Sequence, residues 1–173
     1  MILGIDIVRD LGLIENLCER ELKNPEGAGF DIRVDEIYKN KGFGFLGVED
    51  RKTPNIELVA KHGKDKEYFL KPGEYILVKT IEKLNLPENI AALTFSRSTL
   101  HRSGVLLLAT QAAPGYKGEL IFGLKNLGEE NFKIELGSRI AHVMFFEVKG
   151  KTKNYRGQWQ HGRVATEKEE KQI

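Results

Sequence analysis

The sequence is poor in the residues that build disulfide-rich, metal-dependent or membrane-embedded folds. It has one cysteine, Cys18, so no disulfide can form within the chain, and no Cys/His pair has zinc-ligand spacing. No apolar run approaches the roughly 18 residues of a membrane span, and Asp6 comes too early for a signal peptide. We therefore expect a cytoplasmic protein without a membrane partner.

A strong net charge is also missing. The 27 Lys and Arg residues nearly balance the 25 Asp and Glu residues, which gives a formal net charge of +2. A protein that binds a nucleic acid polymer normally concentrates positive charge on one face. We expect small-molecule or protein partners instead, and the 173 residues fit one domain that buries its own core.

The pattern that is present is typical of β structure. Apolar residues at three- and four-residue spacings within residues 2–22 predict one or two short helices. From residue 28 the spacing changes to two, and strand-like runs follow at 66–70, 74–81, 90–95, 104–109, 118–125, 131–136 and 139–148. Turns rich in Pro and Gly separate many of these runs. Many short strands with regular turns predict a mostly β fold, a distorted antiparallel β-barrel or jelly roll.

Two segments have no clear period. Residues 39–65 are rich in glycine and charge, and we predict a surface insertion within a single β domain of residues 1–148. Residues 149–173 are polar with mixed charge, which predicts a C-terminal arm or a disordered end. Trp159 favours the arm, because a purely disordered segment rarely needs a large apolar ring.

Residues 96–104 (SRSTLHRSG) combine two arginines with several hydroxyls. Arg97 and Arg102 offer forked, permanently charged donors that match phosphate oxygens. Ser98 and Thr99 lie where a short helix would begin, and present hydroxyl and N–H groups to an anion. The alternative is a capped helical turn with solvated arginines, which is more common for an isolated cluster. We predict a polyphosphate site because this cluster is accompanied by other motifs.

Those motifs are AGFDIR at 28–33, GYKGE at 115–119 and YRGQWQ at 155–160. In this order and at these separations, the four motifs resemble the dUTPase and dCTP deaminase family. The resemblance implies a homotrimer that binds deoxyuridine or deoxycytidine nucleotides, with Mg²⁺ carried by the triphosphate. It also implies sites at subunit interfaces, each covered by the arm of another chain.

The resemblance also implies roles for individual residues. Arg97, Ser98, Thr99 and Arg102 would hold the phosphates, with Ser98 and Arg102 stabilising charge during catalysis. The hairpin from Ala109 to Gly118 would read the pyrimidine through its main chain, with Tyr116 packed against the deoxyribose. Arg156 and Gln160 would close the arm over the nucleotide.

Asp31 is expected to have a structural role near the phosphates, with a contact through water to Mg²⁺ as a further option. Its alternative is a solvent-facing strand position, as we expect for Asp35 and Glu36. The histidines show no spacing typical of a base–nucleophile or metal pair, and we predict that His142 and the other three are surface or core residues.

Two carboxylates of the family are absent. Its dUTPases place a water-activating Asp three residues before the hairpin aromatic, where this chain has Ala113. Its deaminases place a proton-shuttling Glu on the following strand, where this chain has Gly123. Glu119 lies too far along the strand to act in place of the missing Asp.

The leading hypothesis is a dUTP diphosphatase, which converts dUTP to dUMP and pyrophosphate, with its water-activating position occupied by Ala113. A dCTP deaminase is one alternative, against which Gly123 counts. A non-catalytic nucleotide-binding homologue is the other, and the two missing carboxylates support it.

Overall fold

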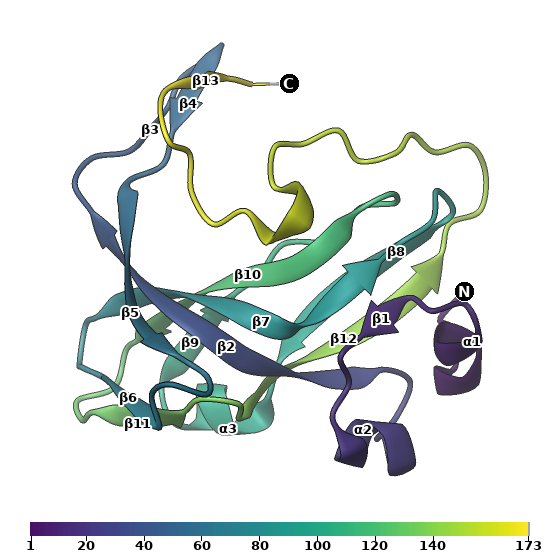
Figure 1. The fold of residues 1–173 in the computed structure, drawn as a ribbon, viewed down its shortest axis with the longest axis horizontal. Helices are drawn as coiled ribbons and strands as arrows, with labels where there is room; N and C mark the ends of the chain where they lie inside the picture. The colour runs from purple at the N-terminus through teal and green to yellow at the C-terminus, as the bar shows by residue number, and fades with distance from the viewer. Residues whose placement is uncertain (173) are drawn as a thin grey trace.

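The computed structural model of the protein describes residues 1–172 (Figure 1). Its helical segments are α1 (Ile5–Asp10), α2 (Glu19–Lys23), α3 (Ser98–Arg102) and the 3₁₀ turn η1 (Gln160–Gly162). Its strands are β1 (Ile14–Glu15), β2 (Phe30–Lys41), β3 (Phe45–Leu46), β4 (Asp50–Lys52), β5 (Asn55–Lys61), β6 (Glu67–Leu70), β7 (Tyr75–Asn85), β8 (Ile90–Ser96), β9 (Val105–Leu108), β10 (Lys117–Asn126), β11 (Phe132–Glu135), β12 (Arg139–Glu147) and β13 (Glu170–Lys171). The predicted strands and the short N-terminal helices are confirmed.

One antiparallel sheet with the order β8-β12-β2-β7-β10-β9 forms most of the molecule. β5 pairs with β2, and β1 pairs with β7. β8 and β9 are the two ends of this order. Ala92 and Ala112 form an antiparallel bridge with 2.9 Å hydrogen bonds in both directions, which links β8 to the segment after β9. The sheet is thus a nearly closed barrel, and the predicted fold class is confirmed.

The core follows from the alternation of side chains along the long strands. In β7, every second residue is buried, among them Ile76 and Val78. Phe30, Phe122 and Phe145 come from β2, β10 and β12, and all three are almost completely buried. Each buried side chain of this size contributes roughly 1.5–3 kcal/mol, so packing between these strands stabilises the barrel.

The prediction that Glu36 faces solvent is wrong. Its side chain is buried and accepts hydrogen bonds from the Tyr38 hydroxyl and from Lys61 Nζ, the latter at 2.6 Å. Register shifts on both sides of β2 near this residue turn Glu36 toward lysines of the neighbouring strands, Lys61 on β5 and Lys79 on β7. Pairing with these charges compensates for the loss of water.

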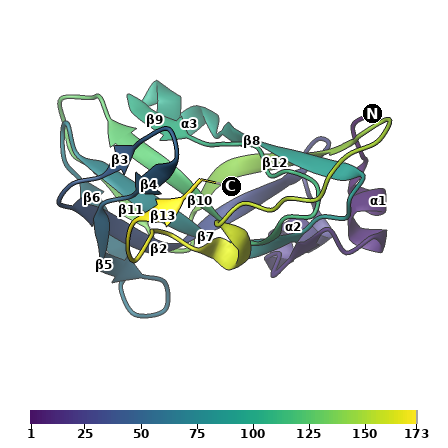
Figure 2. The same cartoon turned by 90° about the horizontal axis from the view of Figure 1, so that it is seen from above.

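The aperiodic segment 39–65 and the C-terminal arm meet in space. β3 and β4 form a small sheet with β13, in which Glu170 pairs with Arg51. β5, at the end of the aperiodic segment, extends the main sheet instead. Figures 1 and 2 show the chain after β12 crossing above β10 and ending beside β4. The division into a domain and an arm stays a prediction, and contacts between the two segments hold the end of the chain beside β4.

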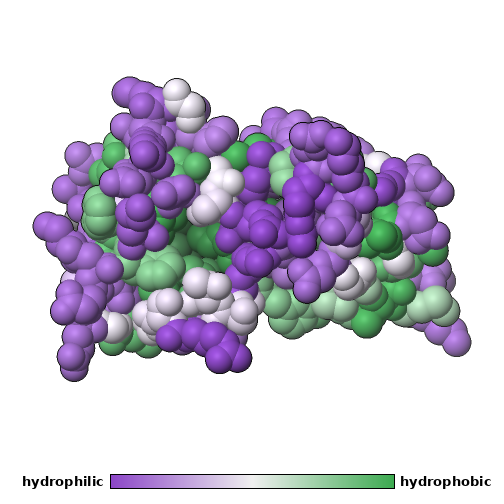
Figure 3. Space-filling view, turned by 90° about the horizontal axis from the view of Figure 1, so that it is seen from below, coloured by the Kyte–Doolittle hydropathy of each residue, from purple (hydrophilic) through white to green (hydrophobic). Residues whose placement is uncertain are grey.

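The surface of the molecule is mixed. Figure 3 shows one face on which hydrophilic residues dominate, while hydrophobic residues appear in a recess and along one edge. β8 and β9 expose apolar side chains, among them Phe95 and Leu108. Within residues 1–172, no helix is both long enough and apolar enough to span a membrane.

Candidate functional site

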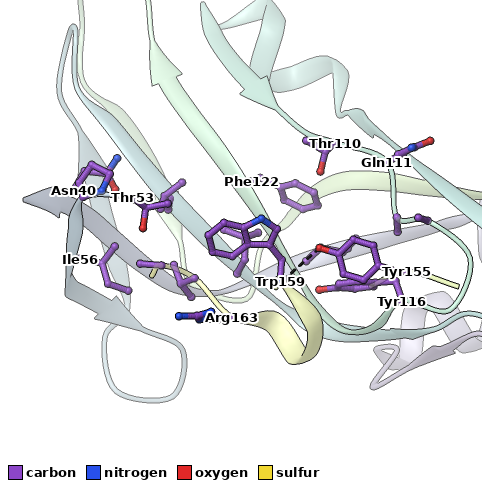
Figure 4. A pocket seen from close by; sticks show the side chains of 18 of the residues that line it. Asn40, Thr53, Ile56, Thr110, Gln111, Tyr116, Phe122, Tyr155, Trp159 and Arg163 are labelled. Atoms are coloured by element: carbon purple, nitrogen blue, oxygen red, sulfur yellow. Dashed lines mark hydrogen bonds between the residues drawn. The ribbon is translucent and has the colours of Figure 1, made fainter. Parts of the chain in front are cut away.

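A cavity of about 540 Å³ lies between β7 and β10, the hairpin before β10, the aperiodic segment and the arm (Figure 4). We call it the hairpin cavity. The hairpin and its flanks contribute Thr110, Gln111, Ala112, Ala113 and Tyr116, and the arm contributes Tyr155, Trp159, Arg163, Val164 and Ala165. The remaining lining residues are Asn40, Thr53, Pro54, Ile56, Tyr75, Leu77, Leu120, Ile121 and Phe122.

The hairpin holds Tyr116 as a fixed wall of this cavity. The Tyr116 N–H donates to the Ala113 carbonyl at 3.1 Å, which closes the turn, and Gly115 N–H donates to Pro87 O at 3.1 Å. The ring is only 7% exposed and meets Tyr155 edge to face, with centroids 5.6 Å apart. Burial raises the pKa of Tyr116 to about 12, and its hydroxyl donates to the Glu119 carbonyl. Tyr116 therefore presents a neutral ring, and its proton is already engaged.

The arm is bonded to the tip of the hairpin. The Gln160 side chain donates to Gly115 O at 3.0 Å and accepts from Lys117 N–H at 2.8 Å. Gly118, with φ +129°, allows this close approach, because a Cβ there would lie 2.5 Å from His161 Cα. The resemblance predicts that Gln160 closes the arm over a nucleotide, and in this structure Gln160 contacts the hairpin itself, while its role toward a nucleotide stays a prediction.

The aperiodic segment holds the other side of the arm. The guanidinium groups of Arg51 and Arg163 both lie over the Trp159 ring, at 5.2 and 6.0 Å from its centroid. Thr53 and Thr166 exchange hydrogen bonds: each backbone N–H donates to the other hydroxyl, at 3.0 and 2.8 Å. Sequence reasoning missed these contacts, since residues 39–65 have no periodicity that points to the arm.

These contacts correct one expectation. We expected the arm to cover the site of another chain, whereas in this structure it lies over the hairpin of its own chain. The pairing of β13 with β4 and the Thr53–Thr166 hydrogen bonds hold it there. Arg156, also predicted to close the arm, is exposed on it.

The predicted phosphate motif lies away from the hairpin cavity. Arg97 precedes α3, and Ser98, Thr99 and Arg102 are exposed on α3, with none of these four residues in the cavity lining. Arg102 has no ion pair among the residues that the structure describes. Ala109, which directly follows β9, is exposed and precedes Thr110 of the lining. A single chain therefore does not bring the phosphate motif to Tyr116.

Asp31 lies at the centre of a buried ionic cluster. Its Oδ2 forms an ion pair with Arg97 and accepts a hydrogen bond from Arg139 at 2.9 Å, while its Oδ1 lies 3.0 Å from His142 Nδ1. Its backbone N–H donates to buried Glu21 at 3.0 Å. Pairing of β2 with β12 places His142 directly opposite Asp31, a contact between strands for which no residue spacing in the chain is a signal.

The surroundings of Asp31 exclude one of its predicted roles. It is 3% exposed, so it is not a solvent-facing strand residue. Both carboxylate oxygens are already engaged by cationic or imidazole groups, and a contact through water to Mg²⁺ stays a prediction. Among residues 1–172, no cluster of three or more His, Cys, Asp or Glu side chains could hold a metal ion. A structural role beside Arg97 remains.

Burial also changes the ionisation of this cluster. Desolvation, aided by the charges of Arg139 and Arg20, lowers the pKa of Arg97, although a guanidinium stays protonated at any physiological pH. Desolvation is likewise the main reason that the pKa of His142 is lowered. Near neutral pH, His142 is therefore uncharged beside Asp31, and Arg20, Arg97 and Arg139 supply the positive charge around the two buried carboxylates, Asp31 and Glu21.

The comparison with known proteins now decides the family. A family model described as dCTP deaminase-like matches residues 9–148. The chain belongs to this dCTP deaminase-like family. It is 36% identical over 140 residues to a protein of Methanothermobacter thermautotrophicus named probable deoxyuridine 5′-triphosphate nucleotidohydrolase, covering 81% of this chain and 89% of that protein. It is 32% identical over 149 residues to the dCTP deaminase of Pyrococcus furiosus, covering 86% and 84%.

Solved structures show the same fold for this dCTP deaminase-like chain. The 2′-deoxycytidine 5′-triphosphate deaminase of Agrobacterium tumefaciens matches with a TM-score of 0.65 and 16% identity, over 83% of this chain. This chain spans 48% of that protein's length. A dUTPase of Staphylococcus bacteriophage 80alpha, described with dUpNHpp, matches with a TM-score of 0.50 and 19% identity, over 83% of this chain and 95% of that one.

The hairpin cavity of this dCTP deaminase-like chain contains no carboxylate among the lining residues described above. Ala113 lines the cavity with a methyl group where the resemblance predicts an Asp. Arg163 is a charged lining residue, and it is paired with Glu170. Within one chain, the cavity can therefore enclose a ligand ring that has polar groups along one edge. Its lining provides no carboxylate that could act as a general base.

Proposed function

We propose that the protein binds dUTP, with its base and sugar in the hairpin cavity and Mg²⁺ carried by the triphosphate. The observation that carries the proposal is the buried Tyr116 ring on the hairpin, enclosed by the arm through Tyr155 and Gln160. A cavity of about 540 Å³ lies within the ~300–1,000 Å³ range of small-molecule sites. The M. thermautotrophicus relative, named as a dUTP nucleotidohydrolase, supports this choice of ligand.

The hairpin supplies recognition in this proposal. Rigid main-chain groups between Ala109 and Gly118 read the uracil edge, and a base that leaves them unpaired binds poorly. The Tyr116 ring packs against C2′ of the deoxyribose. A ribose hydroxyl at that position is crowded and lacks a partner, so UTP is rejected.

The phosphate motif reaches the cavity in a homotrimer. β8 and β9, at the two meeting ends of the sheet, expose Leu93, Phe95, Leu106 and Leu108. Apolar side chains gathered in this way are typical of a protein interface. In the trimer, Arg97, Ser98, Thr99 and Arg102 of one chain hold the triphosphate whose base lies in the cavity of another chain.

Catalysis is limited by position 113. Arg97, Ser98 and Arg102 can stabilise charge that develops on the phosphates. Ala113, however, provides no base to activate water for attack on the α-phosphorus, and the lining has no carboxylate to replace it. We therefore propose a dUTP diphosphatase scaffold with strongly impaired hydrolysis.

The carboxylate-free cavity favours one second candidate, a non-catalytic homologue that binds deoxynucleotides. A dCTP deaminase is less favoured, because Gly123 and the residues around it provide no proton shuttle.

Calorimetric titration with dUTP, dCTP and dTTP in the presence of Mg²⁺, followed by product analysis, separates these candidates. We expect preferential binding of dUTP and slow pyrophosphate release. Tight binding of several deoxynucleotides without turnover supports the non-catalytic homologue, and ammonia release from dCTP supports a deaminase. Absence of binding to all three nucleotides refutes the proposal, and a monomer in light scattering refutes the trimer.

A further inference from the structure

The replacement of the family's second carboxylate involves two residues on neighbouring strands. β10 pairs with β7 so that Gly123 lies opposite Leu77 and Lys125 opposite Tyr75. Because side chains alternate along a strand, Gly123, Leu77 and Tyr75 share one face of the sheet. Tyr75 and Leu77 line the hairpin cavity, so this is the face that the arm covers.

Tyr75 occupies the space that a side chain at position 123 would need. A Cβ built on Gly123 would lie 2.5 Å from Tyr75 Oη, 2.8 Å from Cε2 and 3.0 Å from Cζ. The backbone of Gly123 is not in the left-handed region, so φ gives no reason for glycine here. The phenol occupies the space next to Gly123, so a side chain at position 123, where the resemblance places the carboxylate of the deaminases, would have to displace it.

The hydroxyl of Tyr75 is free to bind a ligand. It makes no hydrogen bond with any residue in the described part of the chain, although the Tyr75 ring is partly buried. Burial raises the pKa of Tyr75, so the phenol keeps its proton at neutral pH. Among mostly apolar neighbours such as Leu77 and Ile121, it is a neutral donor facing the cavity.

This chemistry differs from that of a carboxylate in one useful way. An ionised carboxylate only accepts hydrogen bonds, so it repels a carbonyl oxygen and favours an amino group. A phenol donates, and it therefore tolerates and binds a carbonyl oxygen. Because burial raises its pKa, the Tyr75 phenol also stays un-ionised near neutral pH, where a carboxylate would be charged.

We propose that Tyr75 is a specificity-determining residue, whose hydroxyl donates a hydrogen bond to the oxygen at position 4 of a bound uracil. The proposal rests on the proposed function, because it places the pyrimidine in the hairpin cavity with C4 toward position 123. It explains the glycine at that position as the partner that makes room for the phenol. The pair binds a 4-oxopyrimidine and leaves its C4 unreacted.

The test compares two ligands with the parent protein and with Tyr75→Phe. The ligands are the α,β-imido analogue of dUTP and the matching 2-pyrimidinone deoxynucleotide, which carries hydrogen in place of the 4-oxygen. We expect Tyr75→Phe to weaken binding of the dUTP analogue about three- to tenfold, the size of one neutral hydrogen bond. Binding of the pyrimidinone should change less than about twofold, since it has no bond to lose.

Tyr68→Phe is the matched control. Its hydroxyl donates to Glu74 at 2.7 Å and lies outside the cavity lining, so its removal should leave both affinities unchanged. Equal losses for the two ligands in Tyr75→Phe would show a merely structural role and overturn the proposal. An unchanged affinity for the dUTP analogue would overturn it while the proposed function stands. If the parent protein binds neither ligand, both proposals fail.

Discussion

Replacing Gly123 with alanine tests the steric relation between this residue and Tyr75 without any ligand. The new methyl group would lie 2.5 Å from Tyr75 Oη and 2.8 Å from Cε2. Carbon atoms in ordinary contact are ~3.5–4.0 Å apart, so the ring must move by about 1 Å. Forced shifts of this kind typically cost ~1–3 kcal/mol.

A second effect opposes this cost. Replacing glycine by alanine reduces the conformational entropy of the unfolded chain, which stabilises the folded state by ~0.4–1 kcal/mol where φ is compatible. Gly123→Ala should therefore lower the free energy of unfolding by about 0–2.6 kcal/mol. In the Tyr75→Ala background the contact is gone, and Gly123→Ala should be neutral or stabilising.

Urea unfolding of the parent, the two single variants and the double variant measures this coupling. We expect a favourable interaction energy of about 1–3 kcal/mol in the double variant, whereas independent sites add within ~0.5 kcal/mol. Gly63→Ala is the control. Gly63 has φ +78° and no neighbour within 4 Å of a built Cβ, so its cost is backbone strain that Tyr75→Ala should not change. Additive effects of Gly123→Ala and Tyr75→Ala would show that the phenol does not require glycine.

Four further outcomes follow from the site. Ala113→Asp should raise pyrophosphate release from dUTP by ~10²–10⁴-fold, as a positioned base does; binding without turnover in this variant would favour the non-catalytic homologue. Arg102→Ala should weaken dUTP binding by ~1.5–3 kcal/mol and leave deoxyuridine binding unchanged; a uniform loss, checked by circular dichroism, would indicate misfolding. Truncation after Gly150 should leave the trimer intact in light scattering and weaken nucleotide binding, and a monomeric product would make the arm structural. Burial lowers the pKa of His142, so neutral His142 contributes stability above about pH 6.5 that is lost as the pH falls through its lowered folded-state pKa. His142→Gln should remove this part of the pH dependence of urea unfolding, and an unchanged pH profile would contradict it.

The barrel could be predicted because its strands are amphipathic over short windows. The alternation of buried and less buried residues along β7 can be recognised within one short segment, whichever strand β7 pairs with. The Asp31 cluster could not be predicted in the same way. Asp31 lies on β2, and it meets Arg97, Arg139 and His142 because β12 lies next to β2 in the sheet and β8 lies next to β12. These strands are distant in sequence, so their register cannot be recognised from the spacing of residues along the chain.

The contacts of the arm could not be predicted from the periodicity of apolar residues either, because charged residues make them. Trp159 was recognised as a residue that needs burial, but its neighbours Arg51 and Arg163 are charged residues that would ordinarily be assigned to solvent. Stacking on an aromatic face lets a guanidinium cover the ring and keep its charge. A sequence pattern that counts charge as exposure therefore misses the surface that holds the arm.

The two missing carboxylates differ in what took their place, and this difference has a consequence for restoring activity. At position 113 a methyl group lines the cavity, and a carboxylate there would extend into space that the cavity already provides. At position 123 the space is filled by the Tyr75 phenol, so Gly123→Glu must displace that ring before it can place a carboxylate in the cavity. We therefore expect Ala113→Asp alone to place a carboxylate in the cavity, whereas a carboxylate at position 123 also requires a change at Tyr75.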